Sequence, residues 1–75
     1  GRMAVVRVMR GSGLGGQLLN ALVDIAKARG DKEVHLHAQC SVQAFYALEG
    51  FVPVGEPFDE VGIAHIEMRK VLALR

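Results

Sequence analysis

The amino-acid sequence predicts one α/β domain over residues 1–75, with elements in the order β-α-β-α-β-β and a mixed sheet. A valine-rich segment, RMAVVRVM at 2–9, is followed by four glycines and then by an amphipathic helix pattern. Alternation of apolar and polar residues returns in VHLHA at 34–38 and again near the C-terminus. A helix between two strands favours a parallel pair, and a short turn between the last two strands favours a hairpin.

The first half of the chain predicts a strand, a helix and a second strand. The segment 2–9 is typical of a strand because it is rich in valine and is followed by glycines. A helix is expected from Leu14 onwards, and Gly30, followed by Asp31, is expected to end it in a left-handed conformation. The residues predicted to form the apolar face of this helix are Leu14, Leu18, Leu22 and Ile25, with Ala21 and Ala26 beside them.

A short second helix is predicted after the second strand. Ser41 is a good N-cap residue, and Gly50 is expected to end the helix. One face of this helix would carry Val42, Phe45, Tyr46 and Glu49.

The C-terminal third predicts a hairpin. A third strand over 51–58 contains Pro53 and Pro57, which confine it to a sheet edge or a bulge. The segment 63–74 fits a helix or a strand by pattern alone, and its position after the turn DEVG favours a strand paired with the third. Its alternating apolar residues are Ile66, Met68 and Leu72.

Composition excludes several classes of function. The chain is 51% hydrophobic and has a formal net charge of +1, which is typical of a folded domain without a nucleic-acid-binding face. It has no apolar run long enough for a membrane span and no leader pattern, so we expect a cytoplasmic protein without a membrane partner. The one cysteine, Cys40, is expected to fill space in the core, and no Cys/His spacing predicts a metal site. Because the chain begins at Gly1 rather than Met, we expect a fragment or a processed product.

The glycine cluster at 10–16 is typical of a phosphate-binding loop. The Walker A pattern is excluded because Gln17, rather than Lys, follows Gly16. The dinucleotide fingerprint G-x-G-x-x-G is met literally from Gly11 to Gly16. That fingerprint also needs an acidic residue at the end of the next strand, where 38–40 reads AQC.

A third pattern, R/Q-x-x-G-x-G/A, is met by Arg10, Gly13 and Gly15. It resembles the loop that binds the pyrophosphate of acetyl-coenzyme A (acetyl-CoA) in the GNAT N-acetyltransferase superfamily. The chemistry is that of consecutive N–H groups at a helix start, which form a concave site for an anion. Glycines allow the backbone to approach that anion closely.

The segment FYALEGF at 45–51 supports the same resemblance. Its sequence predicts a Schellman helix end, with Gly50 in the left-handed conformation and Phe51 in contact with Tyr46. It is also similar to the C-terminal F-Y-x-x-x-G-F marker of GNAT enzymes, whose tyrosine commonly faces the cofactor sulfur. We expect both roles for Tyr46.

With HAQ at 37–39 and GIAHIEM at 62–68, these segments are similar to the ElaA-like branch of the superfamily. The resemblance covers nearly all 75 residues. It implies that 1–75 is the cofactor-binding, C-terminal part of an acetyltransferase domain, without the N-terminal strands and helices. It also implies direct transfer of an acetyl group from the thioester of acetyl-CoA to an amine.

The resemblance further implies the site residues. Tyr46 would protonate the leaving thiolate, and a backbone N–H near Ala4 or Val5 would polarise the thioester carbonyl. No acidic general base can be matched, so His35 and His37, which share a face of the second strand, are the candidates beside a plain surface role. The implied acetyl-CoA contacts are Met3, Ala4, Val5, Arg10, Gly11, Ser12, Gly13, Leu14, Gly15, Gly16 and Gln39.

Two other functions stay open at this point. A non-catalytic coenzyme A-binding or interaction module is favoured by the short chain, and a nicotinamide-dinucleotide-binding fragment is favoured by the literal fingerprint. The acceptor amine is not identified by any motif. Because the first strand would leave an open sheet edge, we expect a homodimer or a missing N-terminal half. His65 is expected to make a structural hydrogen bond.

Overall fold

The computed structural model describes the backbone of residues 2–6 and 16–72 and the side chains of residues 17–72. The described elements confirm the predicted order, with one additional turn of 3₁₀ helix, η1. The glycine loop predicted at 10–15 lies outside the described residues. The elements are β1 (Arg2–Val6), α1 (Gly16–Ala28), β2 (Asp31–Gln39), η1 (Cys40–Val42), α2 (Gln43–Leu48), β3 (Val52–Glu60) and β4 (Ile63–Val71).

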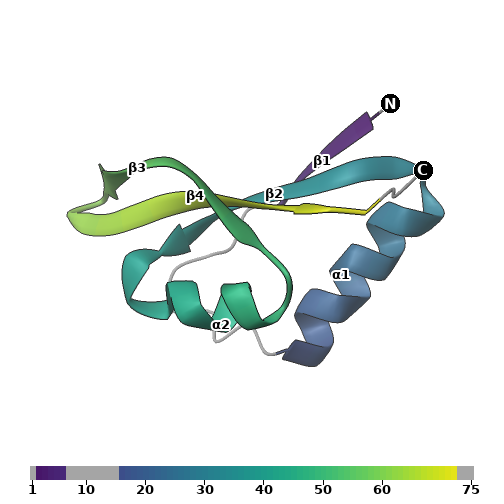
Figure 1. Cartoon of the computed structure of the whole chain (residues 1–75), viewed down its shortest axis with the longest axis horizontal. Helices are drawn as coiled ribbons and strands as arrows, with labels where there is room; N and C mark the ends of the chain where they lie inside the picture. The colour runs from purple at the N-terminus through teal and green to yellow at the C-terminus, as the bar shows by residue number, and fades with distance from the viewer. Residues whose placement is uncertain (1, 7–15, 73–75) are drawn as a thin grey trace.

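The four strands form one mixed sheet in the order β1-β2-β4-β3. β1 and β2 are parallel, as expected for strands joined through a helix, whereas β4 is antiparallel to both of its neighbours, β2 and β3. Figure 1 shows the long β2 and β4 side by side along the sheet. The predicted mixed sheet is therefore confirmed.

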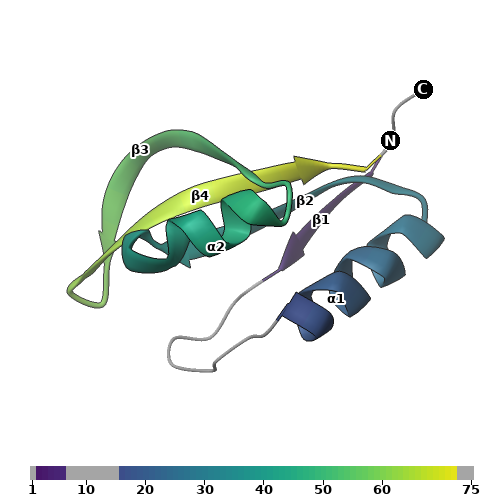
Figure 2. The same ribbon diagram turned by 60° about the horizontal axis from the view of Figure 1, so that its bottom comes forward.

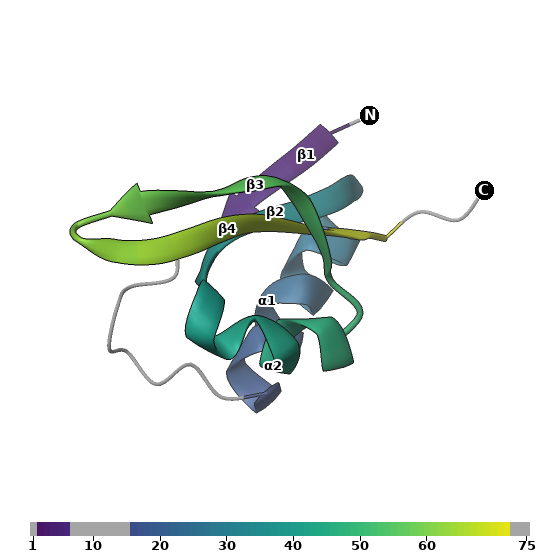
Figure 3. The ribbon, with the colours of Figure 1, turned by 60° about the vertical axis from the view of Figure 1, so that its left-hand side comes forward.

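Both α-helices lie on the same side of the sheet (Figures 1 and 2). A view turned about the vertical axis shows the same two-layer arrangement, with α1 and α2 below the strands (Figure 3). The core lies between the two layers and is built from every second residue of β2 and β4 together with one face of each helix. Its buried residues are Leu19, Val23, Ala26, Val34, Leu36, Ala38, Tyr46, Phe51, Ile66 and Met68.

The buried face of α1 differs from the predicted one. Leu19, Val23 and Ala26 pack against the sheet, whereas Leu18 and Ile25 are 55% and 56% exposed. Both sets follow the helical spacing i, i+4, i+7, so periodicity alone does not distinguish them. The rotation of the helix over β2 buries Leu19 and Val23, so the prediction for Leu18 and Ile25 was wrong, whereas Ala26 is buried as predicted.

The start of α2 also differs from the prediction. Ser41 lies inside η1, α2 begins at Gln43, and its N-cap residue is Val42, without a side-chain capping bond. The chain leaves β2 through a 3₁₀ turn that uses Ser41 as an interior residue. Ser41 is therefore not the N-cap of this helix.

The end of α2 is the predicted Schellman motif. The N–H of Phe51 donates to the carbonyl of Tyr46, and the N–H of Gly50 donates to the carbonyl of Ala47, both at 3.0 Å. Gly50 has φ +94°, and the rings of Tyr46 and Phe51 lie 6.1 Å apart, edge to face. Gly30, with φ +85°, likewise follows the end of α1.

The predicted hairpin is confirmed by β3 and β4. β3 is an edge strand that contains both prolines, and its pairing shifts register between Val54 and Phe58. The connecting residues Val61 and Gly62 both have positive φ, 52° and 76°, as a tight hairpin turn requires. Pro53 and Pro57 are tolerated because β3 is paired on one side only, by β4.

Candidate active site on the two faces of the sheet

The residues expected to contact acetyl-CoA fall on three segments. Met3, Ala4 and Val5 lie in β1, where their backbones are in register with Glu33, Val34 and His35 of β2. Gly16 is the first residue of α1, and Gln39 is the last residue of β2. The residues of this set that lie outside the described part of the chain are Arg10, Gly11, Ser12, Gly13, Leu14 and Gly15.

The carboxyl end of β2 lies beside β4. β2 ends at Gln39, whose cross-strand partner is His65 of β4. The half-buried Gln39 thus lies at the carboxyl end of a parallel pair. Ligands commonly bind at this end of parallel strands.

Tyr46 is held in the core at the end of α2. Its side chain is buried, and its ring lies edge to face against both Phe45, at 5.1 Å, and Phe51, at 6.1 Å. Burial raises the pKa of the Tyr46 phenol above its ordinary value of 10.0. The phenol therefore carries its proton throughout the neutral range, as a proton donor must.

Lys70 of β4 holds the end of α2. Its Nζ donates to the main-chain carbonyl of Glu49 at 2.8 Å and lies 6.0 Å from the centre of the Phe51 ring. A lysine cation at a helix C-terminus bonds a carbonyl that has no partner within the helix. Lys70 therefore ties the helix that carries Tyr46 to the central part of the sheet.

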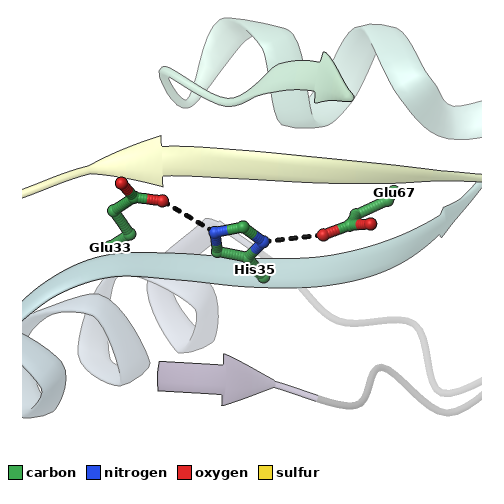
Figure 4. A network of polar contacts seen from close by, with 3 residues as sticks. All are labelled: Glu33, His35 and Glu67. Carbon is green, nitrogen blue, oxygen red and sulfur yellow. Dashed lines mark hydrogen bonds and ion pairs between the residues drawn. The ribbon is translucent and has the colours of Figure 1, made fainter. Parts of the chain in front are cut away.

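The distal face, defined here as the sheet face turned away from α1 and α2, carries a polar network. His35 of β2 lies between two carboxylates, with its Nδ1 2.7 Å from Glu67 and its Nε2 2.8 Å from Glu33 (Figure 4). The hydrogen bond with Glu67, followed by that with Glu33, raises the pKa of His35, against the opposing effect of burial. The bond with His35 in turn lowers the pKa of Glu33, with a smaller contribution from Arg69. His35 is thus an imidazolium with both N–H groups donated.

His37 lies two residues further along β2 on the same distal face. Its side chain is 53% exposed, and its Nδ1 lies 3.3 Å from the carboxylate of Glu60. The ring of Phe58 stands edge to face against it, 5.0 Å away. Phe58 also stacks on the buried His65, whose Nδ1 bonds the carbonyl of Ile63 at 2.7 Å. The structural hydrogen bond expected for His65 is confirmed.

The acidic partners of the two histidines were missed by sequence reasoning. Glu33 could have been found, because Glu33, His35 and His37 alternate along one strand and must share a face. Glu67 and Glu60 carry no such signal, since they reach β2 only through the register of β4 and the fold of β3.

The described residues contain neither a metal-binding cluster nor a membrane-spanning helix. No group of three or more His, Cys, Asp or Glu within residues 17–72 could hold a metal ion. No helix in the described part of the chain is long and apolar enough to cross a membrane. Cys40 is free and packs partly buried against the core, in line with the role expected for it.

Comparison with known proteins agrees with this arrangement. A family model described as the acetyltransferase (GNAT) domain matches residues 1–72. The chain belongs to the GNAT acetyltransferase family. Within this family it is similar to protein ElaA of Escherichia coli strain K12, with 39% identity over 71 residues, 93% of this chain and 46% of ElaA. The crystal structure of E. coli ElaA superimposes with a TM-score of 0.69, at 38% identity over 83% of this chain and 43% of ElaA.

Other solved GNAT structures share the fold. An acyl-CoA N-acyltransferase from Pseudomonas aeruginosa matches with a TM-score of 0.72 and 44% identity, over 81% of this chain and 42% of that protein. A GNAT family acetyltransferase from Elizabethkingia anophelis with acetyl-CoA bound matches with a TM-score of 0.61 and 21% identity, over 92% of this chain and 61% of its own. The last likeness concerns the fold alone. The chain spans less than half the length of ElaA.

Proposed function

We propose that this chain is the acetyl-CoA-binding part of an enzyme that transfers an acetyl group directly from acetyl-CoA to an amine. One observation carries the proposal. In this chain, which belongs to the GNAT family, α1 begins at Gly16 and lies on the same side of the sheet as α2, the helix that contains Tyr46. An anion-binding helix start and a proton donor on the same side suit a cofactor with a diphosphate at one end and a thioester at the other.

The described residues fit acetyl-CoA. α1 is thirteen residues long and has no acidic residue in its first turn, so its N-terminus offers partial positive charge without a competing carboxylate. The predicted loop from Arg10 to Gly16 would add N–H donors for the diphosphate. Gln39, at the end of β2, would contact the arm of the cofactor.

The chemistry proposed for these residues is a single displacement. Acetyl-CoA supplies an activated acetyl group, and an N–H near Ala4 or Val5 would polarise its carbonyl. The phenol of Tyr46 would donate its proton to the leaving thiolate. A phenol is a sufficient donor, because its ordinary pKa of about 10 is close to that of an alkyl thiol.

The two alternative functions are supported by fewer observations. A nicotinamide-dinucleotide fragment has the literal glycine fingerprint in its favour, but the end of β2 carries Gln39 and Cys40 where an acidic residue would hold the ribose. A non-catalytic coenzyme A-binding module would have the same loop. It would not require the buried, protonated Tyr46.

The exposed apolar surface of α1 supports the view that another part of the complete enzyme, or a second copy, covers it. Leu18 and Ile25 are exposed and lie on one stripe of α1 together with the half-buried Leu22. β1 is also an edge strand of the sheet. We expect an N-terminal half of the protein, or a second copy of the chain, to cover these surfaces. The single free cysteine favours the reducing environment of a cytoplasm.

The experiment compares thermal unfolding of the protein with acetyl-CoA, with NAD and with ADP, and then follows thiol release in the presence of amines. Acetyl-CoA at a hundred times its dissociation constant would stabilise the fold by about 2.7 kcal/mol. That corresponds to a rise in Tm of about 11–22 °C for a domain of this size, with a smaller rise for ADP. Stabilisation by NAD alone would overturn the proposal. Binding of acetyl-CoA without thiol release to any amine would favour the non-catalytic module.

A further inference from the structure

Direct acetyl transfer requires an amine that has lost its ammonium proton, and therefore a base on the side from which the amine approaches. This requirement rests on the proposed function. Tyr46 and the helices occupy one side of the sheet. The thioester would thus be approached by the amine from the distal face. The base should lie on that face, near the carboxyl end of β2, where Gln39 is expected to contact the cofactor.

His37 occupies that place. His37 lies two residues before Gln39, on the same face of β2. Leu36 and Ala38 are buried towards the helices, so the side chain of His37 points to the distal face, where it is 53% exposed. It is therefore open to an incoming amine and lies on the opposite side of β2 from Tyr46.

The other two histidines are committed to structural contacts. Both nitrogens of His35 are hydrogen-bonded to carboxylates, at 2.7 and 2.8 Å, so neither is open to an incoming amine. His65 is buried, stacked on Phe58, and bonded through Nδ1 to a main-chain carbonyl. In contrast, the Nε2 of His37 has no partner among the described residues, and only its Nδ1 faces a carboxylate.

The surroundings of His37 orient its ring for proton uptake. The carboxylate of Glu60 on β3, 3.3 Å from Nδ1, favours the tautomer with the hydrogen on Nδ1 and leaves the lone pair on Nε2. Phe58 holds the ring edge to face. The neighbouring titratable groups on β2 and β4 are His35, His65 and Glu67, and Glu67, the cross-strand partner of His37, is engaged by His35.

We propose that His37 is the general base that takes the proton from the acceptor amine through Nε2, and that Glu60 is its positioning residue. The freed lone pair of the amine forms the C–N bond while the C–S bond breaks, and the new C–N nitrogen loses its remaining extra proton to water. The leaving thiolate takes the phenol proton of Tyr46. His37 then releases its proton to water, and Tyr46 regains one from water, so that the products are an amide and a thiol.

The test uses two nucleophiles and the complete protein that carries this chain. Spermidine is an alkylamine that is protonated at neutral pH and needs a base, whereas methoxyamine is already neutral there. His37→Gln should lower kcat for spermidine by about a hundredfold or more, the range of general-base catalysis, and leave kcat for methoxyamine within about threefold. Glu60→Gln should lower kcat for spermidine by about tenfold and shift the acidic limb of the pH–rate profile.

Two further variants separate this role from a general loss of structure. His35→Gln, on the same strand and face, should retain its kcat for both nucleophiles, and Tyr46→Phe should lower kcat for both, because the thiolate leaves in either case. Equal losses for spermidine and methoxyamine in His37→Gln, or no loss, would overturn the assignment while leaving the proposed function in place. A wild-type protein that neither binds acetyl-CoA nor releases thiol with either nucleophile would contradict the proposed function itself.

Discussion

At the scale of single residues, His35 shows how two carboxylates hold an imidazole in its charged form. Its pKa is raised by Glu67 and Glu33, so this contribution to folding is complete below the ordinary value of about 6.5 and is lost as the pH rises through the higher folded value. The pKa of Glu33 is lowered, so its contribution is lost as the pH falls below the ordinary value of 4.5 through the lower folded one. The network therefore stabilises the fold most between these two limits.

We expect His35→Gln to remove part of the pH dependence of stability. As the pH rises from about 6 through the raised folded pKa of His35, the wild-type protein should lose the stabilisation of these hydrogen bonds, about 1 kcal/mol or about 4–8 °C in Tm. The variant should have a lower Tm at pH 6 and a flatter profile above it. Thermal unfolding followed by circular dichroism measures both.

His37→Gln is the matched control, because His37 lies on the same strand and face but against one carboxylate, at the longer distance of 3.3 Å. It should lower Tm at pH 6 by less than His35→Gln does, because it removes one longer contact in place of two hydrogen bonds. Identical slopes in His35→Gln and the wild-type protein would show that the two carboxylates do not hold the proton on His35.

At the scale of elements, α2 depends on its C-terminal motif. The helix has six residues, too few to be stable without tertiary contacts. Gly50 closes it with φ +94°, and a Cβ at this position would lie 3.2 Å from the Cε of Lys70, the residue that bonds the carbonyl of Glu49. The same few atoms thus end the helix, place Tyr46 and exclude any side chain at Gly50.

Gly50→Ala should therefore lower the free energy of unfolding by more than its left-handed conformation alone would. Gly55 provides the comparison, because its φ is +78° and a Cβ there would meet no atom within 4 Å. A left-handed alanine costs about 1–2 kcal/mol. We expect a loss of unfolding free energy of about 1 kcal/mol for Gly55→Ala and about 2 kcal/mol for Gly50→Ala. Urea unfolding measures both, and equal losses would mean that Lys70 moves aside at no cost.

At the scale of the whole molecule, the sheet is stable at its centre and weaker at its margins. β2 and β4 are paired on both sides and supply half of the buried core, namely Val34, Leu36, Ala38, Ile66 and Met68. None of the nine residues of β3 is buried, and its pairing with β4 is interrupted by a register shift. Opening of β3 therefore exposes little apolar surface.

Hydrogen exchange should follow this difference. Amides that join β2 to β4 should exchange with the free energy of global unfolding, and amides that join β3 to β4 between Val52 and Val54 should exchange at least about tenfold faster. Amide exchange by NMR at several denaturant concentrations measures both groups. Equal rates throughout would show that β3 opens only when the whole sheet unfolds.

The local features of this fold could be read from neighbouring residues. The left-handed Gly50, its clasp between Tyr46 and Phe51, and the edge position of the strand with Pro53 and Pro57 each depend on a short stretch of chain. Glycine tolerates positive φ and proline lacks an N–H for the sheet, whatever lies elsewhere. These predictions are therefore confirmed by the structure.

Predictions that depend on contacts between distant segments were less successful. The stripe of Leu18 and Ile25 satisfies the helical period as well as that of Leu19 and Val23, and only the contact with β2 distinguishes the two. Ser41 is a favourable N-cap, but the exit from β2 places it inside a 3₁₀ turn. A favourable N-cap or helix propensity contributes about 1 kcal/mol, and the free energy of tertiary packing exceeds it.

The sequence by itself determined the class and order of the elements and the family resemblance. Only the tertiary structure decided which histidine lies between two carboxylates and which faces one carboxylate at a longer distance. Glu67 lies 32 residues from His35 along the chain, and Glu60 approaches His37 from a strand on the far side of β4. The proton affinity of an imidazole depends on charges within a few ångströms, and those distances exist only once the register of the sheet is set.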